Sequence, residues 1–276
     1  MVALLLLAFP LMLAGLALVV QADDHLLSTT AAGTGSCAQG SYYRKVASLF
    51  GNWQGIQGVV RLGTPQVDPG RVSPIDGGYL DNFSVYMGGN AGGFEEIDAG
   101  LTWEWVRTAS GRWKKAWRPF WRNQSWSEAP PEIYWEPGDT VVMSVTDAGP
   151  GKLRLYVADA GANPGRSFSK VFAAPGFQPY IARQFKRVNA IDQVGREGKP
   201  VEPTSARVTG ATWEETELLE PVATGLQPVP LSPARRIELD CPPGHDRVTA
   251  TPAQSGRGAE SIDIYGEMPP APVPNR

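Results

Sequence analysis

The chain has 276 residues, 42% of them hydrophobic, a formal net charge of −3 at pH 7, two cysteines and two histidines. A net negative charge argues against nucleic acid and acidic lipid surfaces as partners, because both attract basic proteins. Two histidines without a cysteine cluster do not make a zinc site or a serine or cysteine catalytic triad. No phosphate-binding loop or dinucleotide fingerprint occurs either, so we expect no metal and no cofactor.

The amino-terminal segment, residues 2–20, is almost wholly apolar, and Val20-Gln21-Ala22 supplies small residues of the kind that a signal peptidase reads. We expect residues 1–22 to be a signal peptide that directs the protein outside the cell or to the cell envelope. The alternative is an uncleaved membrane anchor, because the run is long enough to span a bilayer and no Lys or Arg precedes Arg44. The preference for Arg over Lys, with abundant Ala, Gly and Pro, is typical of a bacterium with a GC-rich genome.

The body of the chain predicts an all-β domain over residues 41–220, after a flexible lead-in of small and polar residues at 23–40. Runs rich in Val, Tyr, Trp, Phe and Thr recur at intervals close to ten residues and are separated by Gly, Pro, Asn and Asp, which is the pattern of a sandwich or barrel. A helical turn is conceivable only at 43–50. The expected strands are 52–62, 82–89, 95–106, 112–122, 139–147, 152–159, 166–173, 181–191 and 206–219.

Tryptophan is concentrated in one stretch, Trp103 to Trp126, among arginines and lysines. With Ser110-Gly111 as a two-residue hairpin loop, Trp113 and Trp117 would share the face that Trp103 and Trp105 do not use. The tryptophans would then divide between the core and the wall of a groove, where aromatic rings stack on a sugar or a peptide. The candidate ligand-binding residues are Trp103, Trp105, Trp117, Trp121 and Tyr86.

The carboxyl-terminal part reads as a Pro-rich linker at 221–234, short strands within 235–266 that pack back on the sandwich, and a disordered tail at 267–276. Cys37 and Cys241 lie near the two ends of the chain. In an oxidising compartment two thiols usually pair, so we expect a Cys37–Cys241 disulfide, with two free buried thiols as the alternative. We expect a monomer.

Acidic residues gather next to the tryptophans. Glu96, Asp98 and Glu104 share one face if residues 95–106 form a regular strand. Paired carboxylates on one face are what glycoside hydrolysis requires, and a solvated charged face is the alternative reading. A second polar segment, 185–200, contains Asp192 with Asn189 and Gln193, which would form either a polar site at the mouth of a cleft or a turn cap.

Several of these segments, taken in chain order, resemble the glutamic peptidase (eqolisin) family. They are NWQGIQG (52–58), VYMGGN (85–90) with EEIDAGLTWE (95–104), WEPGDTVVMSV (135–145) and the late strand ARQFKRV (182–188). The resemblance covers roughly residues 51–190. It implies a concanavalin-like, jelly-roll antiparallel β-sandwich.

The same resemblance implies where a catalytic pair would lie. The family cleaves with a Glu that activates water and a Gln that stabilises the oxyanion. Asp98, within Ile97-Asp98-Ala99-Gly100, stands where the family has its Gln, and Gln184, within Arg183-Gln184-Phe185, stands where it has its Glu. A carboxylate and an amide are both present but exchanged, with Glu96 and Glu104 as alternative acids.

Three functions remain open. The first is a secreted sandwich that binds a saccharide or a polypeptide in an aromatic-lined groove without catalysis. The second is an acid-active endopeptidase that uses Asp98 and Gln184. The third is a polysaccharide-cleaving enzyme on the same sandwich, which would need two carboxylates about 5–10 Å apart across the cleft.

Overall fold

The computed structural model describes residues 36–92, 95–161, 165–244, 246–252 and 257–267, which form mostly β-strands. The expected signal peptide or anchor and the expected tail beyond Glu267 lie outside the described residues. Within the described ranges, no helix has the length and apolar character needed to cross a membrane.

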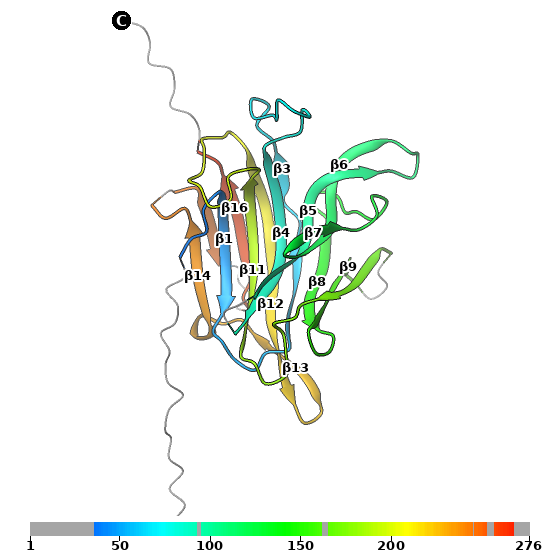
Figure 1. Ribbon diagram of the computed structural model, residues 1–276, viewed down its shortest axis with the longest axis vertical. Coiled ribbons are helices and arrows are strands. Elements are labelled where there is room, and N and C mark those ends of the chain that lie inside the picture. Colours follow the sequence, from blue (N-terminus) through cyan, green and yellow to red (C-terminus); the bar gives the residue numbers. More distant parts are fainter. Residues whose placement is uncertain (1–35, 93–94, 162–164, 245, 253–256, 268–276) are drawn as a thin grey trace, which may run out of the picture. The chain divides into compact units, whose positions relative to one another are not determined.

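Two antiparallel sheets form the fold (Figure 1), and the prediction of an all-β antiparallel sandwich is confirmed. In one sheet seven strands lie side by side in the order β14-β1-β11-β4-β5-β6-β7. The second sheet has the order β10-β9-β8-β2-β12-β16-β15, with β13 and β3 also paired to β12. The strands of the seven-stranded sheet are β1 (Ser41–Ser48), β4 (Asp81–Ala91), β5 (Glu95–Arg107), β6 (Trp113–Asn123), β7 (Ser125–Glu128), β11 (Arg183–Gln193) and β14 (Arg236–Cys241). Those of the nine-stranded sheet are β2 (Gly55–Arg61), β3 (Thr64–Gln66), β8 (Thr140–Asp147), β9 (Lys152–Asp159), β10 (Ser167–Ala173), β12 (Arg207–Val222), β13 (Gly225–Pro230), β15 (Val248–Pro252) and β16 (Glu260–Tyr265).

The core lies between the two sheets and is filled by alternate residues of the longer strands, such as β4, β5, β8 and β9. In β4, for example, Phe83, Val85 and Met87 belong to the core, whereas Ser84 and Tyr86 point to the opposite face. We call that opposite face of the seven-stranded sheet the outer face. Burying large side chains of both sheets in one cluster is the main source of stability of such a fold.

Two sequence expectations about local structure are wrong. Residues 43–50 do not form a helical turn, because β1 pairs with β11 on one side and with β14 on the other, which gives its backbone groups ladder partners. Residues 221–234 do not form a plain linker, because β12 continues to Val222 and turns back as β13. The prolines of β13 are tolerated because β13 pairs with β12 alone, and an edge strand does not need every backbone donor.

The last three strands divide between the two sheets. β14 pairs with β1, whereas β16 pairs with β12 and β15 pairs with β16. The predicted disulfide is confirmed: Cys37 and Cys241 are bonded, with their Cα atoms 5.6 Å apart. The bond closes almost the whole described chain, so it restricts the unfolded state strongly in the chain-entropy view of disulfide stabilisation.

A buried ion cluster joins the two sheets across the core, and we call it the inner cluster. Glu260 of β16 accepts hydrogen bonds from Arg44 of β1 (2.6 Å to Oε1) and from Arg187 of β11 (2.9 Å to Oε2). All three residues are at most 5% exposed. Burial opposes ionisation of Glu260, but the bonds and charges of the two arginines outweigh it and lower the pKa of Glu260 below its usual value.

Candidate functional site

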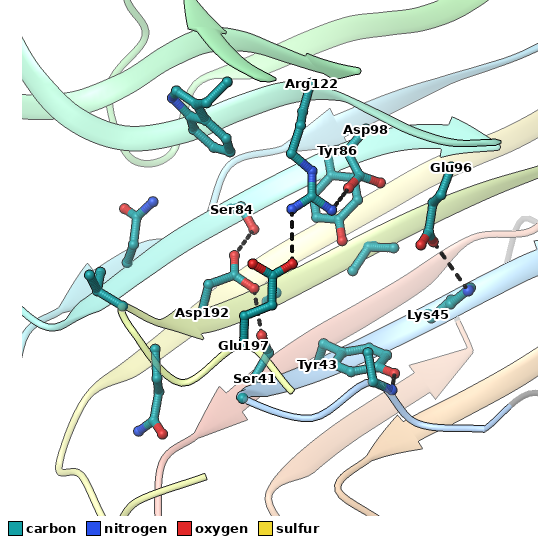
Figure 2. Close-up of a pocket in the computed structure, with 18 of the residues that line it drawn as sticks. Ser41, Tyr43, Lys45, Ser84, Tyr86, Glu96, Asp98, Arg122, Asp192 and Glu197 are labelled. Atoms are coloured by element: carbon teal, nitrogen blue, oxygen red, sulfur yellow. Dashed lines mark hydrogen bonds and ion pairs between the residues drawn. The ribbon is translucent and has the colours of Figure 1, made fainter. Parts of the chain in front are cut away.

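The outer face of the seven-stranded sheet carries a cavity of about 300 Å³. Figure 2 shows side chains from neighbouring strands pointing into it, together with Glu197 from the loop after β11. The charged residues that line the cavity are Lys45, Glu96, Asp98, Arg122, Lys186, Asp192 and Glu197, and its aromatic residues are Tyr43, Tyr86, Phe120 and Trp126.

Asp98 lies at the floor of the cavity, only 4% exposed, and both of its carboxylate oxygens meet a cation. Oδ1 is 2.7 Å from Nζ of Lys186, and Oδ2 accepts a hydrogen bond of 2.7 Å from Nη2 of Arg122. Burial opposes protonation of Lys186, but the charges of Asp98 and Glu96 outweigh it and raise the pKa of Lys186. Asp98 is therefore one member of an ion cluster that includes two cations.

A glycine makes this contact possible. Gly88 of β4 is the register partner of Asp98 on one side and of Lys186 on the other. A Cβ atom at Gly88 would lie 1.8 Å from the backbone oxygen of Ile97, and a backbone atom cannot move aside cheaply. Because β4 offers no side chain at this point, the carboxylate and the ammonium meet across it.

Gln184 does not face Asp98. Its Nε2 donates a hydrogen bond of 2.7 Å to the carbonyl oxygen of Ser48, and Gln184 is not among the residues that line the cavity. The residue of β11 that meets Asp98 is Lys186, two positions further on. The structure thus does not bring the proposed catalytic carboxylate and amide together as a pair.

The two alternative acids are placed differently. Glu96 lines the cavity, pairs with Lys186 and lies 3.9 Å from Nζ of Lys45. The positive charge of Lys186 lowers the pKa of Glu96. Glu104 lies outside the cavity, where it pairs with Lys115 at 3.2 Å.

Asp192, at the end of β11, differs from the other cavity acids because it has no ion pair with any described residue. Its Oδ1 accepts a hydrogen bond of 2.8 Å from the hydroxyl of Ser41, and its Oδ2 accepts one of 2.7 Å from the hydroxyl of Ser84. Burial raises the pKa of Asp192, since two neutral hydroxyls do not compensate for the water that an ionised carboxylate loses.

An aromatic wall closes one side of the cavity. Tyr86 packs edge-on against Phe120 at 5.9 Å, and Phe120 stacks on Trp126 at 4.3 Å. Trp126 is 46% exposed, so a guest in the cavity could reach its ring. Burial raises the pKa of Tyr86 well above its usual value, so Tyr86 remains a neutral phenol.

The other predicted ligand-binding aromatics face away from the cavity, because the hairpin between β5 and β6 has one more loop residue than expected. Trp103 pairs with Trp117, and Arg107 pairs with Trp113, which leaves a three-residue loop, Ala109–Gly111. Gly111 adopts φ +80°, as such loops require. A shift of one residue moves every side chain of a strand to the other face. The prediction that the tryptophans of β5 and β6 divide between two faces is therefore wrong.

The consequence differs for each of these tryptophans. Trp117 is a core residue, 1% exposed, with its ring 5.6 Å from that of Trp103. Trp103 and Trp121 pack partly buried against the same core. Trp105 is 50% exposed and does not line the cavity. Of the five predicted ligand-binding aromatics, only Tyr86 lines it.

Sequence reasoning missed the cations of the site, Lys45, Arg122 and Lys186, and also Trp126. Each stands at an alternating position on the same face as Asp98 or Tyr86, but that signal appears only once the strand register is known. Asp192 was singled out within 185–200, and it does lie at the cavity. Of its two companions, Gln193 also lines the cavity, and its Nε2 donates a hydrogen bond of 2.8 Å to the carbonyl oxygen of Glu202. Asn189 does not line the cavity, and its Oδ1 accepts a hydrogen bond of 2.8 Å from Nε1 of buried Trp213.

The residues that the structure describes include no group of three or more His, Cys, Asp or Glu side chains that could hold a metal ion. The groups that line the cavity are carboxylates, ammonium and guanidinium groups and aromatic rings, together with neutral polar and small side chains. This arrangement can bind a polar, partly cationic guest against an aromatic wall.

Several solved structures resemble the chain in fold, among them two of one glutamic peptidase. Scytalido-glutamic peptidase with a peptide-based transition state analog has a TM-score of 0.54 and 11% identity, over 83% of this chain and 100% of that chain. The same peptidase with a transition state analog inhibitor has a TM-score of 0.52 and 12% identity, over the same shares. The resemblance to glutamic peptidases that the sequence motifs indicated is thus confirmed at the level of the fold. No protein-family model and no curated protein matches the sequence.

Proposed function

We propose that this chain is an exported binding protein that holds a polypeptide in the cavity on the outer face of the seven-stranded sheet and does not cleave it. The observation that carries the proposal is the pairing of Asp98. Each of its oxygens already contacts a cation, Lys186 or Arg122, which is the arrangement of a structural ion cluster. The amide expected beside it, Gln184, bonds a backbone carbonyl elsewhere.

A polypeptide is favoured over a saccharide by the composition of the cavity. Sugar platforms use flat, open aromatic faces, whereas one face of Trp126 is covered by Phe120, and the other cavity aromatics are largely packed among their neighbours. The fold neighbour named above is a peptidase whose structure holds a peptide-based analog. That likeness in fold supports a polypeptide as the class of guest.

Export is supported by two features of the chain. One is the apolar segment at residues 2–20 with a signal-peptidase site after it, and the other is the Cys37–Cys241 disulfide. Disulfides persist in oxidising compartments, which agrees with a location outside the cell or in the envelope.

The proposal is tested with the purified chain from residue 23 onward and denatured casein, by measuring release of soluble peptides from pH 3 to 7 and, in parallel, casein binding by surface plasmon resonance. We expect binding without cleavage. The matched variant Trp126→Ala should weaken binding several-fold, whereas Trp105→Ala, an exposed tryptophan outside the cavity, should leave binding unchanged. Turnover in the wild type that disappears in Asp98→Ala would overturn the proposal.

Acid-dependent hydrolysis is the second candidate, and one observation favours it. Asp192 is a carboxyl group in the cavity that lacks a cation and whose pKa is raised by burial, which is the state of many catalytic acids. If Asp192 were the acid, casein cleavage would appear at low pH, survive in Asp98→Ala and vanish in Asp192→Asn.

A further inference from the structure

The charges of the cavity are unevenly matched. Lys186 forms ion pairs with Asp98 and Glu96. Arg122 forms an ion pair with Asp98 and lies 3.7 Å from Glu197. Lys45 is nearest to Glu96. Every cation of the cavity is therefore directed to another acid, and Asp192 alone among the described cavity carboxylates has no cation within ion-pair distance.

The remaining bonding capacity of Asp192 has a definite geometry. An ionised carboxylate has about four lone-pair positions, two on each oxygen. The hydroxyl of Ser41 uses one position on Oδ1 and that of Ser84 uses one on Oδ2. One position remains on each oxygen, which is the arrangement that the two parallel N–H groups of a guanidinium fill.

The surroundings suit the rest of an arginine side chain. Figure 2 shows the carboxylates of Asp192 and Glu197 on the same side of the cavity, and Glu197 is 90% exposed in its side chain, so it can follow a guest. Trp126 lines the same cavity, is 46% exposed and offers an apolar surface to the methylene stem. A metal ion is a poor alternative, because no third carboxylate or histidine completes a set with these two among the described residues.

We infer that Asp192 and Glu197 form a recognition subsite for a basic side chain, arginine in preference to lysine, of the bound polypeptide. This inference rests on the proposed function and names the class of ligand that it selects. A guest guanidinium supplies the positive charge that the partly buried carboxylate of Asp192 lacks, so binding and ionisation of Asp192 support each other.

Binding should depend on pH in a direction set by the groups that face Asp192. Its neighbours from the packed elements are Ser41, Ser84, Asp98, Arg122 and Glu197, together with the phenol of Tyr86. Burial and the charge of Asp98 raise the pKa of Asp192, and Arg122 opposes them. The ionised form is the one that binds a cation, so affinity should rise as pH increases through that raised pKa and fall as pH drops below it.

The test uses fluorescein-labelled heptapeptides of alanine with arginine, lysine or citrulline at the centre, measured by fluorescence anisotropy against the purified chain from residue 23 onward. Citrulline keeps the shape of arginine and removes its charge. We expect the arginine peptide to bind about tenfold or more tightly than the citrulline peptide, as a charge-assisted hydrogen bond implies, with lysine between them.

The variant Asp192→Asn should abolish the preference for arginine over citrulline and leave citrulline binding intact. Glu197→Gln should reduce the preference, and the control Glu220→Gln, an exposed glutamate on β12, should not change it. Thermal unfolding of each variant confirms that it is folded.

The outcomes separate this inference from the proposed function. Equal binding of the arginine and citrulline peptides, or a preference that survives Asp192→Asn, overturns the arginine subsite while polypeptide binding stands. Failure of all three peptides to bind overturns both. Binding of chitosan oligosaccharides in place of peptides, lost in Asp192→Asn, would show that the site takes the amino group of a glycan, and would also overturn the inference.

Discussion

The same two strands build two ion clusters on opposite faces of the seven-stranded sheet. Arg44 and Arg187 point inward to Glu260, whereas their sequence neighbours Lys45 and Lys186 point outward into the cavity. The inner cluster is enclosed by both sheets. The outer one is open to solvent and includes a carboxylate without a cation, Asp192. The enclosed inner cluster can contribute to the stability of the fold. A carboxylate without a cation at an accessible surface, such as Asp192, can instead recognise a ligand.

The largest loss of stability should come from replacing Trp117, which faces the core between the two sheets. Its ring is fully buried, and its Nε1 donates to the carbonyl oxygen of Gly63 at 3.1 Å. Trp117→Ala should lower the free energy of unfolding by about 4–5 kcal/mol, measured by urea denaturation. The control is Trp126→Ala on the outer face, which should cost no more than about 1 to 2 kcal/mol, because its ring is half exposed. Equal losses of stability in Trp117→Ala and Trp126→Ala would contradict the expectation that the core side of the sheet contributes more to stability than the outer face.

Breaking the inner cluster should come next. Glu260→Ala leaves two buried guanidinium groups without their shared carboxylate, so the free energy of unfolding should fall by about 3 kcal/mol or more. The matched change on the outer face, Glu96→Ala, removes a half-exposed carboxylate and leaves Lys186 paired with Asp98. It should cost less than about 1 kcal/mol. The comparison fails if Glu96→Ala proves as costly as Glu260→Ala.

Replacing Asp98, at the floor of the cavity, should cause an intermediate loss of stability. Asp98→Asn leaves Lys186 with Glu96 alone and should cost about 1–3 kcal/mol, as removal of a charged partner from a buried group does. A double-mutant cycle with Lys186→Met measures the coupling directly, and we expect at least about 1 kcal/mol between the two residues. Additive effects would mean that the ion pair contributes nothing to stability.

The smallest effect is a difference in pH dependence between the two faces. The pKa of Glu260 is lowered in the folded protein, so its contribution to stability is present above the unfolded value of 4.5 and is lost as pH falls through the lower folded pKa. The pKa of Asp192 is raised, so stability declines as pH rises from 3.8 through the folded pKa and stays reduced above it.

The two variants should therefore shift the melting temperature in opposite directions. Relative to the wild type, Asp192→Asn should gain stability between pH 4 and pH 7, whereas Glu260→Gln should lose most stability at pH 7 and less at pH 3. Parallel melting curves at several pH values measure both. A loss for Asp192→Asn that grows with pH would show that Asp192 is held by a favourable charge after all.

Much of this protein was determined by its sequence alone. The alternation of apolar and polar residues with regular turn signals fixes the strands and the all-β class, because a strand with one buried face needs that alternation. The two cysteines near the chain ends determined the disulfide, and the order of short motifs indicated the sandwich of the glutamic peptidases. These are properties of local spacing or of a few rare residues, which a sequence displays directly.

Only the tertiary structure decided which side chains meet. One extra loop residue at Ala109–Gly111 placed Trp117 and Trp121 of β6 against the core, and hairpin loop length is hard to read when several residues of the turn are small or polar. Lys186, and not Gln184, faces Asp98, because the contact depends on the register of β4, β5 and β11 and on the space above Gly88. Whether Asp192 has a cation beside it depends on side chains from five strands and a loop. Their positions relative to one another are set only when the sheet is assembled.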